Sequence, residues 1–144
     1  MTGAHRTSWC RPAVILILLL GGCGPGVQQI EVATNLAWQE SGVTVEAGQI
    51  VVLEASGRYV FHLDGHDTGP AGIADAEAAT GAWPEPTLTG LALLGRVGDA
   101  GPPFVVGEGA EIQADTSGTL WFRVNDDIFD ENDGALTVVV SIEP

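Results

Sequence analysis

The sequence predicts an all-β fold, an antiparallel β-sandwich or jelly roll, for three reasons. Residues 119–125 and 135–142 alternate between two side-chain faces with a period of two, which is typical of half-buried strands. Further β-branched runs are separated by Gly-, Pro- and Asp-containing turns. No segment has a convincing helical period. About seven or eight strands without a helix favour two packed antiparallel sheets.

The expected elements follow one another with short breaks. Residues 41–57 contain two β-branched runs around the turn EAGQ, and LALLGRV (residues 91–97) is an apolar run typical of a strand buried on both faces. PFVVG and AEIQA are short strand candidates. Between these elements, residues 65–86 are rich in Gly, Pro, Ala and acidic residues. They predict a long surface loop, with a helical turn at 74–79 as its one regular element, and long loops are often functional.

The last two strands also predict which residues form the core. The side chains expected to face inward are Leu120, Phe122 and Val124 in the first strand and Leu136, Val138, Val140 and Ile142 in the second. The opposite face is formed by Thr119, Trp121 and Arg123 in the first strand and by Thr137, Val139 and Ser141 in the second.

The amino terminus predicts a lipoprotein signal. Basic residues precede AVILILLL (residues 13–20), which is too short to span a bilayer and is typical of a signal-peptide core. The next residues, LGGC, match the bacterial lipobox, so we expect cleavage before Cys23 and lipid on its thiol. Residues 1–22 would then be the signal peptide, 23–29 the lipidated cysteine with a flexible spacer, and 30–144 one domain. An aspartate directly after the lipidated cysteine tends to retain a lipoprotein in the inner membrane. Gly24 stands at this position instead, which favours the outer membrane or cell surface. A plain signal peptide is the alternative.

The part of the chain after the signal is strongly acidic. It keeps three arginines, no lysine and all 19 acidic residues, a net charge of −16. Such a surface repels phosphate backbones, which argues against nucleic acid as a partner, and it attracts divalent cations. Cys10 and Cys23 are the only cysteines, so no thiol remains for a disulfide or a metal after cleavage and acylation.

An acidic loop joins the last two strands. VNDDIFDENDG, Val124 to Gly134, holds five carboxylates and no basic residue. Such crowding is unfavourable, because each carboxylate raises the free energy of its neighbours' ionised forms. An EF-hand loop that starts at Asp130 is excluded. Its invariant glycine belongs at position six, but Gly134 falls at position five, and position twelve is Ser141 in place of a glutamate. A bound Ca²⁺, which takes about six to eight oxygen ligands, explains the clustering. A solvated hairpin tip is the alternative.

From about Ile30 onward the chain resembles the PA-IL family of small calcium-dependent galactose lectins. The resemblance rests on residues 35–57, on DGHDTGPAGI (64–73), on 91–107 and on 117–140, in the family's order. The last segment contains the Asn-Asp that opens the family's calcium loop and the Asn-x-Gly that closes it. The resemblance implies a galactose-binding-domain-like β-sandwich with Ca²⁺ as cofactor.

The resemblance also implies the calcium ligands. In the family they are the aspartate of the Asn-Asp pair, two adjacent Asn or Asp side chains before x-Gly, and two backbone carbonyls. We expect Asp127 and Asp133 to lie outside the coordination shell of the calcium ion. The implied ligands in this chain are Asp126, Asn132, either Asp130 or Glu131, the carbonyl of Ile128, and the carbonyl of Phe61 or His62.

The sugar itself stays open. In the family a histidine and a glutamine of the preceding long loop contact a sugar hydroxyl, but AGIADAEAATGAWPEP (residues 71–86) contains neither. A galactose-like sugar or another glycan therefore remains the expected partner. Trp83 either offers an aromatic face to a sugar or packs its loop onto the sheet. The residues expected at the ligand-binding edge are Asp126, Asn132, His62, His66 and Trp83.

No catalytic arrangement is predicted. His62 and His66 are four residues apart, but they lie in a strand end and turn rather than on a helix, which disfavours a zinc site. No Ser/His/Asp or Cys/His set and no carboxylate pair in a catalytic context emerges, so we expect no enzyme activity. The sequence predicts a calcium-dependent carbohydrate-binding module of a cell-envelope lipoprotein, anchored to the membrane through Cys23. The alternative is a structural or adhesion domain whose calcium only orders the loop. A homo-oligomer is left open.

Overall fold

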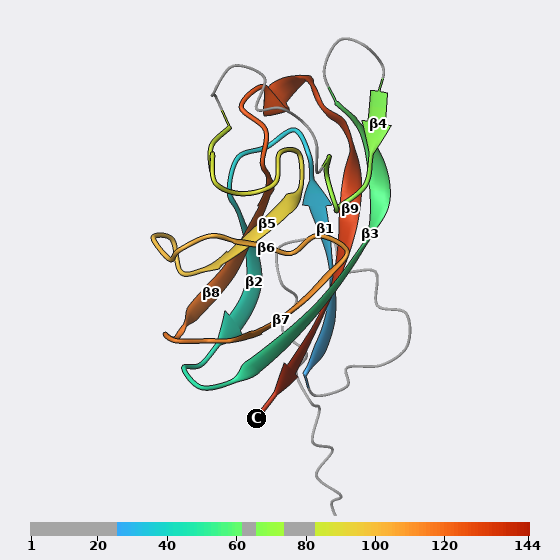
Figure 1. Ribbon diagram of the computed structural model, residues 1–144. Coiled ribbons are helices and arrows are strands. Elements are labelled where there is room, and N and C mark those ends of the chain that lie inside the picture. The colour runs from blue at the N-terminus through green and yellow to red at the C-terminus, as the bar shows by residue number, and fades with distance from the viewer. Residues whose placement is uncertain (1–25, 62–65, 74–82) are drawn as a thin grey trace, which may run out of the picture.

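Two antiparallel sheets pack face to face in the computed structural model, which describes residues 26–61, 66–73 and 83–144 (Figure 1). The described residues form nine strands and one turn of 3₁₀ helix. The predicted all-β antiparallel sandwich is therefore confirmed.

The larger sheet is built around the two longest strands. Its order is β1-β9-β3-β4, and β7 pairs with the opposite end of the same long β3. These strands are β1 (Val27–Ala33), β3 (Ile50–Phe61), β4 (His66–Thr68), β7 (Gly109–Gln113) and β9 (Asp133–Glu143).

The smaller sheet has the order β2-β8-β5-β6, so β8 and β5 are its inner strands. The short 3₁₀ helix η2 (Phe129–Glu131) lies in the acidic loop between β8 and β9. The strands of this sheet are β2 (Gln39–Val45), β5 (Leu93–Val97), β6 (Phe104–Val105) and β8 (Gly118–Val124).

The core lies between the sheets and is formed by the alternating side chains that the sequence predicts. Leu120, Phe122 and Val124 of β8 are buried there, and so are Leu136 and its partners two and four residues further along β9. Burial of one such side chain contributes about 1.5–3 kcal/mol, so these strands supply much of the driving force for folding.

Strand β5 is buried on both faces, as its continuous apolar run predicts. Leu93 points into the core, and Leu94 is equally buried on the other side. Gly95 lets Phe104 cover this strand closely, because a Cβ at Gly95 would lie 2.8 Å from the Phe104 ring.

Two expected boundaries need correction. Strand β1 begins at Val27, which pairs with Ser141, so residues 27–29 belong to the sheet and not to a flexible spacer. The predicted loop 65–86 contains strand β4, whose His66 pairs with Phe61 of β3. Both segments are short, and pairing with a long neighbouring strand decides their conformation.

Several expectations concern residues that the structure does not describe. The signal peptide, Cys23 and the helical turn at 74–79 all lie outside the described residues. Within the described residues, no helix has the length and apolar character that a membrane span requires.

Candidate functional site

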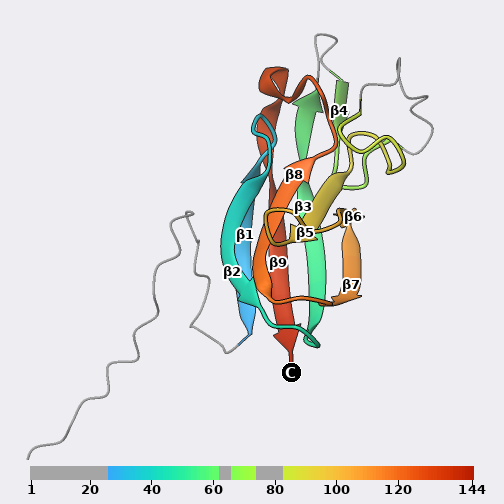
Figure 2. The ribbon, with the colours of Figure 1, turned by 90° about the vertical axis from the view of Figure 1, so that its left-hand side faces the viewer.

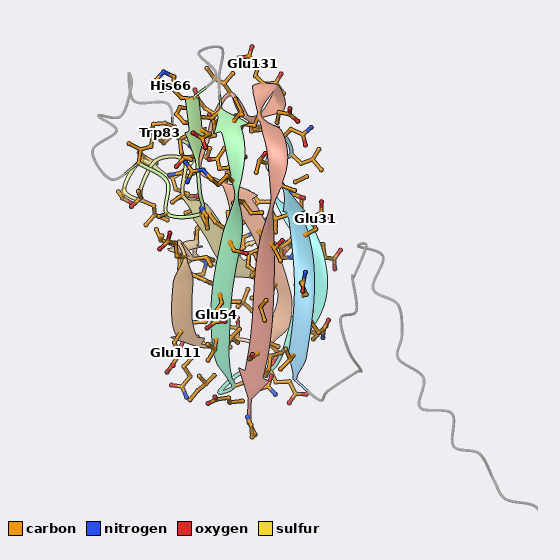
Figure 3. The ribbon with its side chains drawn as sticks, turned by 90° about the vertical axis from the view of Figure 1, so that its right-hand side faces the viewer. Glu31, Glu54, His66, Trp83, Glu111 and Glu131 are labelled. Atoms are coloured by element: carbon orange, nitrogen blue, oxygen red, sulfur yellow. The ribbon has the colours of Figure 1, made fainter. Side chains whose placement is uncertain are left out.

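The acidic loop lies at one end of the sandwich, where four segments meet. Strand β9 leaves the loop antiparallel to β3, with Asp133 in register with Val60, and Thr34 at the end of β1 contacts the other side of the loop. Strand β4 and the segment that leads from Trp83 into β5 reach the same end (Figure 1). Glu131, His66 and Trp83 are accordingly found together at this end in Figure 3.

Asp126 and Asn132 form the centre of this site. Asp126 is 4% exposed although it carries a carboxylate. Its Oδ1 accepts a hydrogen bond from the Ile128 N–H at 2.9 Å, and its Oδ2 accepts one from Asn132 Nδ2 at 2.9 Å. The side chain that opens the loop is therefore joined directly to the side chain that closes it.

Asn132 has one polar atom that the fold leaves without a partner. Its Nδ2 donates to the Thr34 carbonyl at 3.1 Å as well as to Asp126, and the residue is 5% exposed. Its Oδ1 is buried and accepts no hydrogen bond. Buried polar atoms in native proteins almost always have a partner, so this oxygen points to a donor or a cation that the chain itself does not supply.

Gly134 allows the loop to close against the neighbouring strand. Its φ is +124°, and a Cβ at this position would lie 3.1 Å from the Arg58 carbonyl oxygen. The Gly134 carbonyl accepts the Thr34 hydroxyl at 2.7 Å. The Asn-x-Gly sequence thus fixes the position of Asn132 through the backbone that follows it.

Arg123 supports the loop from the other side of β8. It is only 7% exposed, although the sequence pattern places it on the outer face. Its Nη2 donates to the Asp126 carbonyl at 3.0 Å, and its Nε donates to the Val124 carbonyl at 3.0 Å. Burial lowers the pKa of the Arg123 guanidinium, while the nearby carboxylates of Asp126 and Glu85 raise it.

Asn125 fixes the segment that follows Trp83. This residue is completely buried, and its Oδ1 accepts the Glu85 N–H at 3.0 Å. Its Nδ2 donates to the carbonyls of Glu85, Leu88 and Thr89. The residue next to Asp126 therefore holds this neighbouring segment against the end of β8.

Trp83 packs on Gly90, a turn residue in the segment that leads into β5. A Cβ at Gly90 would lie 2.8 Å from the Trp83 ring, so the indole lies directly on the Gly90 backbone and remains half-buried. This contact lies within one segment, so both roles expected for Trp83 stay predictions.

Tyr59 lies under the site, and its surroundings place it near the Asp126 charge. Its hydroxyl donates to the Leu91 carbonyl, and Leu91 in turn donates its N–H to the Asn125 carbonyl at 2.9 Å. Burial raises the pKa of Tyr59 far above its usual value, and the Asp126 carboxylate raises it further. This region is therefore both desolvated and negative.

The other expected ligands occupy more exposed positions. Asp130 and Glu131 are exposed in η2, and Ile128 is 39% exposed, with its carbonyl accepting the Glu131 N–H at 3.3 Å. In the described residues, no three His, Cys, Asp or Glu side chains come together as a metal-binding group. The acids of this loop therefore do not converge, and the close contact is between one carboxylate and one amide.

The remaining predicted positions are distributed around this centre. Asp127 and Asp133 are exposed, as expected. His66 is exposed on β4, and its ring centroid lies 6.3 Å from that of Phe61. His62 lies outside the described residues.

Sequence reasoning assigned no role to three residues that support the site, namely Thr34, Arg123 and Asn125. Thr34 contacts Asn132 only because β1 pairs with β9, and no local sequence pattern predicts this contact. The sequence indicates the burial of Arg123 only weakly, through the aromatic residues near it on the same strand and in the loop.

The fold and this end of it define a class, two-sheet β-sandwiches that carry an acidic loop between their last two strands. Among solved structures, the chain is similar to the N-terminal domain of EclA, which is described as a PllA-like lectin. The TM-score is 0.62 and the sequence identity 26%, over 80% of this chain and 95% of that chain. No family model matches the sequence, and the comparison with curated proteins found no match. The expected similarity to a lectin is therefore confirmed at the level of structure.

Proposed function

We propose that this protein is a calcium-dependent carbohydrate-binding domain, held at the cell envelope through a lipid on Cys23. The observation that carries the proposal is the buried pair of Asp126 and Asn132 at the end of a sandwich similar to a lectin. The expected absence of catalysis is part of the proposal, and so is the position at the outer membrane or cell surface, which rests on the LGGC motif.

The residues at this site fit a calcium ion. Each carboxylate oxygen of Asp126 has lone pairs beyond the single hydrogen bond that it accepts, and Asn132 Oδ1 is a buried oxygen without a donor. Either Asp130 or Glu131 would be the further side-chain ligand, and the carbonyls of Ile128 and of Phe61 or His62 would complete the shell. Hard cations prefer such neutral and anionic oxygens. When bound, calcium supplies a double positive charge and coordination positions that sugar hydroxyls can fill.

The chain itself would position and select the sugar. Asn125 holds residues 85–89 beside the loop, and Trp83 is packed on Gly90, so this side of the site is a fixed wall. His66 lies at the same end of the molecule (Figure 3). A rigid wall reduces the entropy lost on binding, which favours recognition of one sugar orientation.

One observation favours a second function, a structural or adhesion domain without sugar binding. Asp126 already binds the Ile128 N–H and the Asn132 amide, so the loop has internal order of its own. In addition, residues 71–86 contain neither histidine nor glutamine to contact a sugar hydroxyl. In this case calcium would stabilise the loop and no glycan would bind.

A glycan array separates the two functions. Wild-type protein should bind glycans in calcium and lose the binding in chelator. Asp126→Asn should bind none, whereas Asp127→Asn, a change of the same charge at an exposed neighbour, should bind as wild type does. Calcium binding by calorimetry without any glycan signal would support the structural domain. Absence of calcium binding would overturn both forms of the proposal.

The anchor is tested separately. Cys23→Ser should move the protein from the membrane fraction to the soluble fraction. A variant that stays with the membranes would contradict the lipid anchor and leave the calcium site unaffected.

A further inference from the structure

The outer face of the smaller sheet carries a cluster of two arginines and three aromatic rings. Figure 2 shows this sheet in front of the larger one, with β2, β8 and β5 toward the viewer. Arg96 on β5 is in register with Trp121 on β8, and Arg123 lies two residues further along β8. We call the group formed by Trp38, Arg96, Trp121, Arg123 and Phe129 the arginine–tryptophan face.

The guanidinium groups lie over these rings within cation–π distance. Arg96 Cζ is 4.3 Å from the centroid of the Trp38 ring and 5.4 Å from that of Trp121. Arg123 Cζ is 5.9 Å from the Trp38 centroid and 5.3 Å from that of Phe129. All three aromatic residues remain half-buried, so the cluster stays partly open to solvent.

This face carries two of the few positive charges of an acidic protein. The chain has a net charge of −14 and only five basic residues, two of which belong to the face. Among the described residues, the one ion pair joins Arg58 to Asp67, elsewhere on the molecule. Glu40 is in register with Trp121 and exposed, yet it forms no ion pair with either arginine of the face.

The donors of Arg96 are not satisfied by the described chain. A guanidinium has five N–H donors in its plane, and stacking on an indole occupies its faces but not these donors. Arg123 uses its Nε and Nη2 for backbone carbonyls. Arg96 Nε is buried and has no acceptor, so a ligand at the surface would meet the Nη groups of this half-buried side chain and not Nε. Arg96 and Arg123 lie over the same Trp38 ring, so the two cations are close together, although the carboxylates of Asp126 and Glu85 also lie near Arg123.

We propose that the arginine–tryptophan face binds a carboxylated sugar of an acidic polysaccharide, independently of calcium. A carboxylate accepts two parallel N–H bonds from one guanidinium, and the apolar face of a sugar ring can pack on an indole. An extended polymer suits an open sheet face, whereas small-molecule sites are usually concave. Nucleic acid is disfavoured, since it places a charge about every 1.7 Å and this chain repels dense anions.

The test measures binding of oligogalacturonate by calorimetry in chelator, at about 0.15 M salt, where charges more than about 8 Å apart are screened. The fully methyl-esterified oligosaccharide is the neutral ligand control. We expect wild type to bind the acid form and not the ester. Arg96→Gln should weaken binding by roughly tenfold or more, because bidentate charged hydrogen bonds are lost. Arg58→Gln, which removes the same charge from the other sheet, should leave binding unchanged.

One further variant keeps the outcome decisive. Arg96→Lys keeps the charge but not the planar fork, so its binding should fall between that of wild type and Arg96→Gln even if the latter folds poorly. The proposal is overturned by no binding, by equal binding of the ester or of polyphosphate, or by equal losses in the Arg58 and Arg96 variants.

Discussion

Replacing Asp126 by asparagine changes one atom of the carboxylate that joins the two ends of the acidic loop. The carboxylate accepts two hydrogen bonds at 2.9 Å, one from the Ile128 N–H and one from Asn132 Nδ2. An asparagine has one acceptor oxygen and one NH₂ group, so one of these donors would face another donor. The variant therefore loses at least one charge-assisted hydrogen bond in a buried position.

The size of the effect follows from these contacts. A hydrogen bond to a charged group contributes about 1.5–3 kcal/mol, so calcium-free Asp126→Asn should lose about that much free energy of unfolding. Its melting temperature should fall by roughly 5–12 °C for a domain of this size. Its calcium dissociation constant should rise by about a hundredfold, which corresponds to about 2.7 kcal/mol.

Asp127→Asn is the matched control, because it removes the same charge from the exposed neighbour. Its stability should change by no more than about 0.5 kcal/mol, and its calcium affinity only by a long-range term that salt screens. Urea denaturation in chelator and calcium calorimetry give the two quantities for both variants. Equal losses of calcium affinity would show that the loop attracts calcium only as a diffuse negative charge, and the residue-level site would be wrong.

Three further predictions concern the support of the site. Asn125→Ala should lower the free energy of unfolding by about 2–4 kcal/mol in urea denaturation, because it leaves the buried polar groups of residues 85–89 without partners. Gly134→Ala should cost about 1–3 kcal/mol by the same measurement, since φ is +124° and the Arg58 carbonyl is in the way; an unchanged midpoint would contradict this. The folded pKa of Tyr59 lies above its unfolded value of about 10, so its contribution to stability is complete below about pH 10 and declines as the pH rises. Because Tyr59 is the only tyrosine, tyrosinate absorbance should appear only together with alkaline unfolding, and its appearance in folded protein would refute the burial argument.

Most of the fold could be predicted from local patterns. Alternation along β8 and β9 and the continuous apolar run of β5 are direct consequences of which face of each strand is buried. Strand β4 and the start of β1 have no such pattern, because their pairing with β3 and β9 is decided by chain segments far away in sequence. Local periodicity carries no information on these partners.

The candidate site was less predictable than the fold. The contact between Asp126 and Asn132 agrees with the expected loop, but the number of acidic residues suggested a cluster of carboxylates. In the described residues the acids of the loop do not converge, because η2 turns Asp130 and Glu131 outward. Composition records how many carboxylates a loop has, whereas the turn geometry decides which of them face inward.

The consecutive residues Asn125 and Asp126 explain how a loop of this length can present an ordered site. Successive residues at the end of a strand point in different directions, and here one holds the 85–89 segment while the next holds the closing asparagine. Arg123, on the same strand, donates a hydrogen bond to the Asp126 carbonyl and so holds the backbone at Asp126. A shift of β8 would therefore displace the wall and the proposed ligands together. The geometry of the site depends on the register of β8 between β2 and β5, which the buried Leu120, Phe122 and Val124 secure.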